Sequence, residues 1–192
     1  MVMKKYLIIL LSFFFLQINS QTNQDISDAA ISIIDPDIIY NGDWVTIPYP
    51  NGDVPPTIGV CTDVIIRALR KISIDLQKEI HEDMKENFAE YPNNWGHTKP
   101  YSSMDHRRVW NQMKYFERQG KSLNITTDAE NYKPGDIVAY DLGGGTTHIA
   151  IVVDVKSDDG ERYQIVHNIG RGQVMEDTLF SYHKIIGHYR IF

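Results

Sequence analysis

The chain has 192 residues, a formal net charge of −6, 42% hydrophobic residues and a single cysteine. This length suits one domain with a core of its own. An acidic chain without a basic stripe is a poor binder of nucleic acid, whose phosphates require clustered Lys and Arg, and it does not suit an anionic membrane surface. We therefore expect neither as a partner.

The first twenty residues are typical of a secretory signal peptide. A basic Lys4-Lys5 pair precedes an apolar run over 6–16, which has the length of a signal-peptide core and is too short for a confident membrane span. We place cleavage after Ser20. The prediction is a single mature domain over 21–192, exported to the periplasm or the cell exterior without stable membrane insertion. A retained membrane anchor is the alternative.

Helices are predicted through the first two thirds of the chain. A short one precedes Pro36, which ends it. A second begins at or near Cys61, because apolar residues then recur at spacings of three and four. A helical insertion is expected at about 75–120. It holds one helix with apolar residues at strict i,i+4 spacing from Leu76 and another that Asp105 caps.

The last third of the chain changes to short β-rich runs separated by Gly, Asp and Ser turns. These runs are 136–140, 148–155, 162–168 and 185–191. Asp158-Asp159-Gly160 reads as a hairpin turn between the middle two. Helices followed by strands predict an α+β domain with an antiparallel sheet.

Cys61 is the first candidate for chemistry. A lone cysteine in an exported protein makes no internal disulfide, which indicates a reactive thiol or intermolecular pairing. The alternative is a small buried hydrophobe. At a helix N-terminus, unpaired backbone N–H groups and the helix dipole favour a thiolate. Asp63, in the first turn, acts in the opposite direction because a nearby negative charge favours the neutral thiol.

A cysteine nucleophile needs a base, and His148 is the best placed of seven histidines. It opens an apolar strand, and alternation places it on one face with Ala150 and Val152. We expect the Cys61 helix to pack on this face, because small Ala150 permits a close approach. A structural histidine is the alternative.

The base needs an orienting group, and the adjacent pair His167-Asn168 offers two. Neighbours on a strand point to opposite faces, so at most one of them meets His148. Either side chain can hold the imidazole tautomer by one hydrogen bond. Strand alternation alone does not decide whether His167 or Asn168 is the orienting group.

No metal or cofactor is predicted. His81-Glu82 lacks the second histidine of a zinc helix motif. His97, Asp105 and His106 have spacings typical of no zinc site. The triple glycine at 143–145 precedes a strand and not a helix, so it lacks the context of a phosphate-binding loop.

Several short motifs resemble a known superfamily. In chain order they are Tyr49-Pro-Asn-Gly52, Cys61 opening a helix, Pro134-Gly-Asp-Ile-Val-Ala-Tyr140, His148-Ile-Ala-Ile-Val152 and Ile165-Val-His167. This order resembles the NlpC-type branch of papain-like cysteine peptidases, which are bacterial cell-wall endopeptidases. A larger share of the chain is similar to an exported bacterial family called domain of unknown function 1287. That similarity includes Gly59-Val-Cys-Thr-Asp63, His81-Glu-Asp-Met84, Asp105-His-Arg-Arg108, His167-Asn-Ile-Gly170 and Gly187-His-Tyr-Arg190.

The resemblance implies a papain-like fold, in which the helix bearing the cysteine packs on an antiparallel sheet. It implies Cys61 as nucleophile, His148 as base and His167 as the third polar residue, with Asn168 as the alternate. It also implies that Tyr49 lines the site beside the cysteine. The remaining substrate contacts are assigned to Asp63, Trp95, Asp105, His106 and Arg107.

The sequence departs from the peptidase pattern by having Thr62-Asp63 where Ser-Gly usually follows the cysteine. We expect an exported monomeric hydrolase that cleaves an amide bond in peptidoglycan stem peptides through a Cys61 thioester. One alternative is a non-catalytic envelope module that binds peptide or glycan through Trp95, Tyr101 and Arg107. Another is an acyltransferase that uses the same thioester.

Overall fold

The computed structural model describes residues 20–182 and 184–192, so the expected signal peptide lies almost wholly outside the described residues. The long helices are α1 (Asn23–Ser32), α2 (Cys61–Lys71), α3 (Leu76–Asn87) and α4 (Val109–Arg118). The short 3-10 helices are η1 (Phe88–Glu90), η2 (Asp105–Arg107) and η3 (Ala129–Asn131). The strands are β1 (Ile39–Tyr40), β2 (Ile58–Gly59), β3 (Ile137–Gly143), β4 (Thr146–Lys156), β5 (Tyr163–His167), β6 (Val174–Glu176) and β7 (Lys184–Tyr189).

The main sheet is antiparallel, with strand order β6-β5-β4-β3-β7. The turn between β3 and β4 contains Gly143, Gly144 and Gly145, all at positive φ, where side-chain-bearing residues are strained. A second, two-stranded sheet pairs β1 with β2 in parallel. The predicted α+β class with an antiparallel sheet is confirmed.

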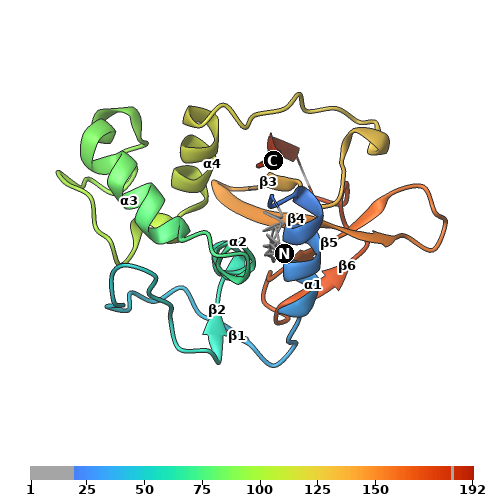
Figure 1. Ribbon diagram of the computed structural model, residues 1–192, viewed down its shortest axis with the longest axis horizontal. Helices are drawn as coiled ribbons and strands as arrows, with labels where there is room; N and C mark the ends of the chain where they lie inside the picture. Colours follow the sequence, from blue (N-terminus) through green and yellow to red (C-terminus); the bar gives the residue numbers. More distant parts are fainter. Residues whose placement is uncertain (1–19, 183) are drawn as a thin grey trace, which may run out of the picture.

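The helices cover one face of the main sheet. In Figure 1, α2 lies at the centre, between α3 on the left and α1 on the right, and both α1 and α2 contact β4. The core beneath them includes Ile149, Ile151 and Val153 of β4, all fully buried with Val64 and Ile65 of α2. The cysteine helix therefore packs on the sheet as predicted, because alternate β4 side chains supply a continuous apolar surface.

The opposite face of the sheet carries a separate apolar cluster. Ala150 and Val152 lie in it with Tyr140, Tyr132 and Leu179. The prediction that α2 packs on the Ala150 face is therefore wrong. Large apolar residues on the other face bury more area against a helix than small Ala150 does, and loop residues cover the Ala150 side.

The expected helical insertion is present as α3, η1, η2 and α4. The helix predicted from Asp105 is interrupted, because Asp105 lies in η2 and α4 begins at Val109. Strands β1, β2 and β6 have only two or three residues each and were not predicted. Within the described part of the chain, no helix is both long and apolar enough to cross a membrane.

The motif residue Asp136 is structural. Its buried carboxylate accepts hydrogen bonds from His188 Nε2 at 2.8 Å, Arg190 Nε at 2.7 Å and the Lys133 backbone N–H at 2.8 Å. Burial acts to raise the Asp136 pKa, but these hydrogen bonds outweigh it and lower the pKa. The network joins the turn before β3 to the end of the chain.

Candidate active site

Cys61 is the first residue of α2, and it is 4% exposed. The helix begins there because Asp63 Oδ2 accepts a hydrogen bond from the Val60 backbone N–H at 2.7 Å, which satisfies one of the free donors at the helix N-terminus. The backbone of Ile149 and the side chain of Tyr40 lie beside the sulfur, and both act to lower its pKa. The thiol therefore lies beside the N-terminal half of β4, on the face that α2 covers with Ile149, whereas the side chain of His148 belongs to the opposite face with Ala150.

The thiol is not poised as a thiolate. Burial raises the Cys61 pKa to about 11, and the backbone of Ile149 opposes this only in part. The nearby Asp63 carboxylate raises the pKa further. The expectation that the helix N-terminus favours a thiolate is therefore overturned, because loss of hydration outweighs the helix dipole at this depth.

His148 belongs to a chain of polar side chains that continues through His167 to Glu176. Its Nε2 lies 2.9 Å from His167 Nδ1, and His167 Nε2 lies 3.0 Å from Glu176 Oε2. His148 and His167 are buried. Burial lowers the His148 pKa to about 3, and His167 beside it adds to the shift, so the ring is neutral.

The chain of hydrogen bonds fixes the tautomers of both rings. A carboxylate only accepts, so the proton between Glu176 and His167 belongs to His167 Nε2. His167 Nδ1 is then an acceptor and takes the proton of His148 Nε2. This leaves His148 Nδ1 with a free lone pair. That nitrogen is the one able to accept a further proton.

Strand register explains why His167 contacts His148 and Asn168 does not take that place. Val152 of β4 pairs with Ile165 of β5, so residues of β5 at odd numbers share the face of His148. Asn168 falls on the α2 side. There its Nδ2 donates to the Gly59 carbonyl at 3.4 Å, and its Oδ1 accepts from the Gly170 N–H at 3.0 Å.

The tyrosine beside the cysteine is Tyr40. Its phenol lies beside Cys61, and burial followed by the charge of an ionised Cys61 raises its pKa to about 12. Tyr49, predicted to line this position, contacts α3 instead: its ring lies 4.9 Å from that of His81. The reason is the pairing of Tyr40 with Gly59 in the small parallel sheet, which brings residue 40 to the cysteine and sends the intervening segment outward.

Two predicted substrate contacts, Asp63 and Arg107, form a buried ion pair. Arg107 Nε and Nη2 each lie 2.9 Å from a carboxylate oxygen of Asp63, and both side chains are 2% exposed. Thr62 Oγ1 also donates to the Arg107 carbonyl at 2.9 Å. These contacts clamp η2 against the first turn of α2. Their geometry corresponds to a structural role, because neither charge faces solvent.

Of the other predicted contacts, Asp105 and His106 belong to η2, and Trp95 lies in the loop between η1 and η2. Asp105 is buried and accepts a hydrogen bond from the Tyr101 backbone N–H. His106 is buried, and burial lowers its pKa to about 3. Trp95 is 40% exposed, and the Arg108 guanidinium stacks 3.7 Å from its ring centroid. Of these, Trp95 is the one that reaches the surface.

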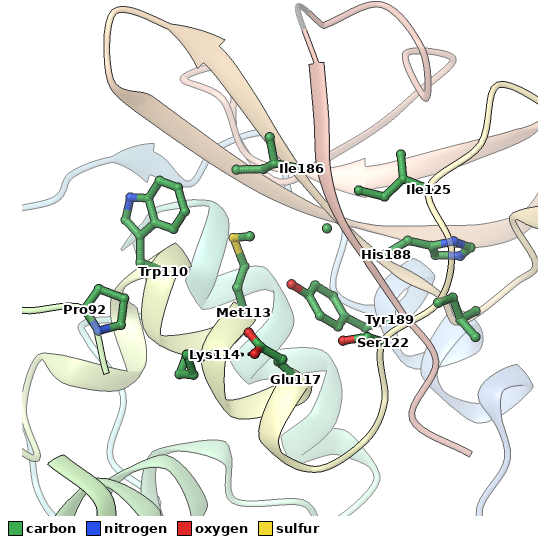
Figure 2. A pocket seen from close by; sticks show the side chains of 12 residues that line it. Pro92, Trp110, Met113, Lys114, Glu117, Ser122, Ile125, Ile186, His188 and Tyr189 are labelled. Atoms are coloured by element: carbon green, nitrogen blue, oxygen red, sulfur yellow. Dashed lines mark hydrogen bonds and ion pairs between the residues drawn. The ribbon is translucent and has the colours of Figure 1, made fainter. Parts of the chain in front are cut away.

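A cavity of about 420 Å³ lies between α4 and β7, away from this cluster. Figure 2 shows Trp110 and Met113 of α4 opposite Ile186 of β7. Neither Cys61 nor His148 lines it. Across residues 20–182 and 184–192, no three His, Cys, Asp or Glu side chains are arranged to hold a metal ion.

Sequence reasoning missed Tyr40, Glu176 and Tyr182. The hydroxyl of Tyr182 lies 3.3 Å from His167 Nδ1, and its ring lies 5.5 Å from that of His148. Glu176 stands in a strand of three residues, too short for a periodic signal. Its one usable signal was position, since an acidic residue on a strand after His167 can pair with it across a hairpin.

Comparison with known proteins gives a family and a fold. A family model described as "Domain of unknown function (DUF1287)" matches residues 27–191. The chain is 45% identical over 176 residues to "Uncharacterized protein YijF" of Escherichia coli strain K12, covering 92% of this chain and 85% of that protein. A crystal structure of an N-acetylmuramoyl-L-alanine amidase from Bacteroides uniformis superposes with a TM-score of 0.51 at 13% identity. That match covers 88% of this chain and 99% of the amidase, and it shows a shared fold.

Proposed function

The chain belongs to the DUF1287 family, and from this premise we propose that it is a cysteine hydrolase that cleaves an amide bond in peptidoglycan stem peptides. The observation that carries the proposal is the directed hydrogen-bond chain from Glu176 through His167 to His148. It leaves His148 Nδ1 unprotonated, and the backbone of the next residue, Ile149, lies beside the Cys61 sulfur. The order of motifs shared with NlpC-type peptidases supports the same assignment.

The reaction begins from a neutral pair. Cys61 Sγ attacks the substrate carbonyl carbon while its proton passes to His148 Nδ1, because the high pKa of the buried thiol disfavours a preformed ion pair. The developing oxyanion lies near the N-terminus of α2, where the Cys61 backbone N–H can donate to it. Glu176 stabilises the imidazolium through His167, since its charge acts along the hydrogen bonds.

The intermediate then collapses. The C–N bond breaks, and the imidazolium of His148 gives its proton to the leaving amine. The resulting thioester is attacked by water, which loses a proton to His148. The C–S bond breaks, the carboxylic acid product leaves, and Cys61 regains its proton.

Peptidoglycan as substrate implies that the protein works outside the cytoplasm. The signal-peptide pattern in the first twenty residues supports export to the periplasm or exterior, followed by cleavage after Ser20. The mature domain is then 21–192, and we propose that it acts as a monomer. Mass spectrometry of the N-terminus of the mature protein tests the cleavage site.

Product analysis tests the activity. Purified peptidoglycan is digested with the protein, and new amino and carboxyl termini are assigned by mass spectrometry. We expect one class of amide bond to be cut, and Cys61→Ala to abolish the cut while the circular dichroism spectrum is unchanged. A Cys61→Ala protein that cleaves at the original rate contradicts the mechanism. Adding an amine acceptor separates hydrolysis from acyl transfer.

One observation favours a second candidate, a non-catalytic module that binds the cell envelope. A thiol that is 4% exposed with a raised pKa also fits a packing role. Such a module binds peptidoglycan fragments without altering them. Binding by the wild-type protein with no new termini after prolonged digestion supports the module and contradicts the hydrolase.

A further inference from the structure

Aromatic side chains gather on the surface beside Cys61. Tyr40 is 46% exposed and Trp44 is 51% exposed. The ring of Trp44 lies 5.8 Å from that of half-buried Tyr101 in an edge-on arrangement, and the ring of His97 lies 4.6 Å from that of Tyr101. Single exposed aromatics are common on protein surfaces, whereas a contiguous group indicates a binding surface. We refer to Tyr40, Trp44 and Tyr101 as the aromatic row, in which Trp44 and Tyr101 are in contact and Tyr40 precedes Trp44 by four residues.

The aromatic row begins at the thiol. The side chain of Tyr40 lies beside Cys61, close enough for each to shift the pKa of the other. The backbone that follows is held in place by Arg107, which donates to the carbonyls of Asn41 and Asp43, each at 3.4 Å. The same guanidinium pairs with Asp63 on the cysteine helix.

Trp44 is four residues from Tyr40, a chain length that spans at most about 14 Å. A substrate a few units long can therefore touch Trp44 and Cys61 together.

We propose that the aromatic row is a subsite for a sugar ring of the glycan strand, an inference that rests on the proposed action on peptidoglycan. Aromatic faces carry negative partial charge and attract C–H groups that bear slight positive charge. In peptidoglycan the extended faces of C–H groups belong to the pyranose rings, because stem-peptide side chains are small or charged. The amide bond cleaved then lies close to the glycan and not at a distant peptide cross-link.

The kinetic test compares two substrates, a muropeptide that keeps its disaccharide and the same stem peptide without sugar. We expect the wild-type protein to prefer the sugar-bearing substrate by about tenfold or more in kcat/KM. Trp44→Ala and Tyr101→Ala should remove most of that preference and leave kcat/KM for the free peptide unchanged. Trp110→Ala is the matched control, since this tryptophan is 37% exposed on α4 and lies outside the row. Equal cleavage of both substrates, or loss of preference in Trp110→Ala alone, overturns the subsite.

A separate binding experiment distinguishes failure of the proposed subsite from failure of the proposed hydrolase function. Isothermal titration with a tetramer of N-acetylglucosamine, which has no peptide, uses the inactive Cys61→Ala protein with and without Trp44→Ala. We expect binding that weakens at least tenfold when Trp44 is removed. If no amide is cleaved but this binding persists, the subsite stands and the hydrolase fails. If amides are cleaved without sugar preference and the tetramer does not bind, the hydrolase stands and the subsite fails.

Discussion

Glu176 is the residue whose replacement tests the proposed mechanism most directly. It is the only charged acceptor in the described hydrogen-bond chain, and it acts on His148 only through His167. Glu176→Gln keeps the size of the side chain and an oxygen acceptor but removes the charge. Glu176→Leu removes the acceptor, so His167 is free to carry its proton on Nδ1. His148 then loses the fixed tautomer that leaves its own Nδ1 basic.

The expected loss of kcat/KM can be estimated from the hydrogen bonds that Glu176 makes. A hydrogen bond to a charged group contributes about 1.5–3 kcal/mol and a neutral one about 0.5–1.5 kcal/mol. Because Glu176 is 22% exposed and also pairs with Arg171 at 2.9 Å, we take the lower difference, about 1 kcal/mol. Glu176→Gln should therefore lower kcat/KM about fivefold. Loss of a buried acceptor costs about 1–3 kcal/mol, so Glu176→Leu should lower kcat/KM by about 5- to 160-fold.

Two assays are needed. Turnover of a muropeptide gives kcat/KM, and nitrogen-15 NMR of the imidazole rings reports the tautomers without any substrate. In the wild-type protein we expect His148 and His167 both protonated on Nε2, and a mixture of tautomers in Glu176→Leu. Arg171→Ala is the control, because it removes only the 70% exposed partner of Glu176 and should change kcat/KM less than twofold.

Wild-type turnover of Glu176→Leu would show that the Glu176 carboxylate does not assist His148. Retention of the Nε2 tautomer by both rings in that variant would show that the carboxylate does not fix the tautomers. A loss of turnover with unchanged tautomers would place the role of Glu176 in packing and not in orienting His148.

The raised pKa of Cys61 predicts that its rate of alkylation by iodoacetamide keeps rising about tenfold per pH unit beyond pH 9; a plateau below pH 7 would reveal a preformed ion pair. Arg107→Met leaves the Asp63 carboxylate buried and unpaired, so urea unfolding should show a loss of about 3–5 kcal/mol. Adding Asp63→Asn should restore part of this loss, and no recovery would mean that Arg107 acts through packing alone. The lowered pKa of Asp136 means that the folded state holds its proton less tightly than the unfolded chain does. Its stabilising effect is therefore complete above about pH 4 and is lost as the pH falls further, a dependence that Asp136→Asn should remove from acid unfolding curves.

The local spacing of apolar residues was sufficient to predict most of the helices and strands. The i,i+4 spacing from Leu76 and the stripe after Cys61 predicted α3 and α2, since these helices bury one continuous face. The β-rich runs predicted β3, β4, β5 and β7 within a few residues. β6 was missed, because a three-residue strand depends on its partner for its conformation and carries little signal of its own.

The candidate site required information that no single sequence contains. His167 and Asn168 are equivalent by alternation, and only the register between β4 and β5 places His167 on the face of His148. Tyr40 reaches Cys61 through a pairing between β1 and β2 that joins residues 19 positions apart. Burial also decided the protonation of the thiol, and burial depends on the whole fold.

The pairing of Tyr40 with Gly59 fixes both ends of the segment 41–57, which carries Trp44. A loop with fixed ends tolerates changes in length, because each doubling of its length costs only about 0.6 kcal/mol in closure entropy. The segment is also held to α2 near its far end, because Asp53 pairs with both Arg67 and Arg70. A change of length between Tyr40 and Asp53 would therefore move Trp44 and leave the cysteine helix in place, so the proposed sugar subsite can vary without displacing Cys61.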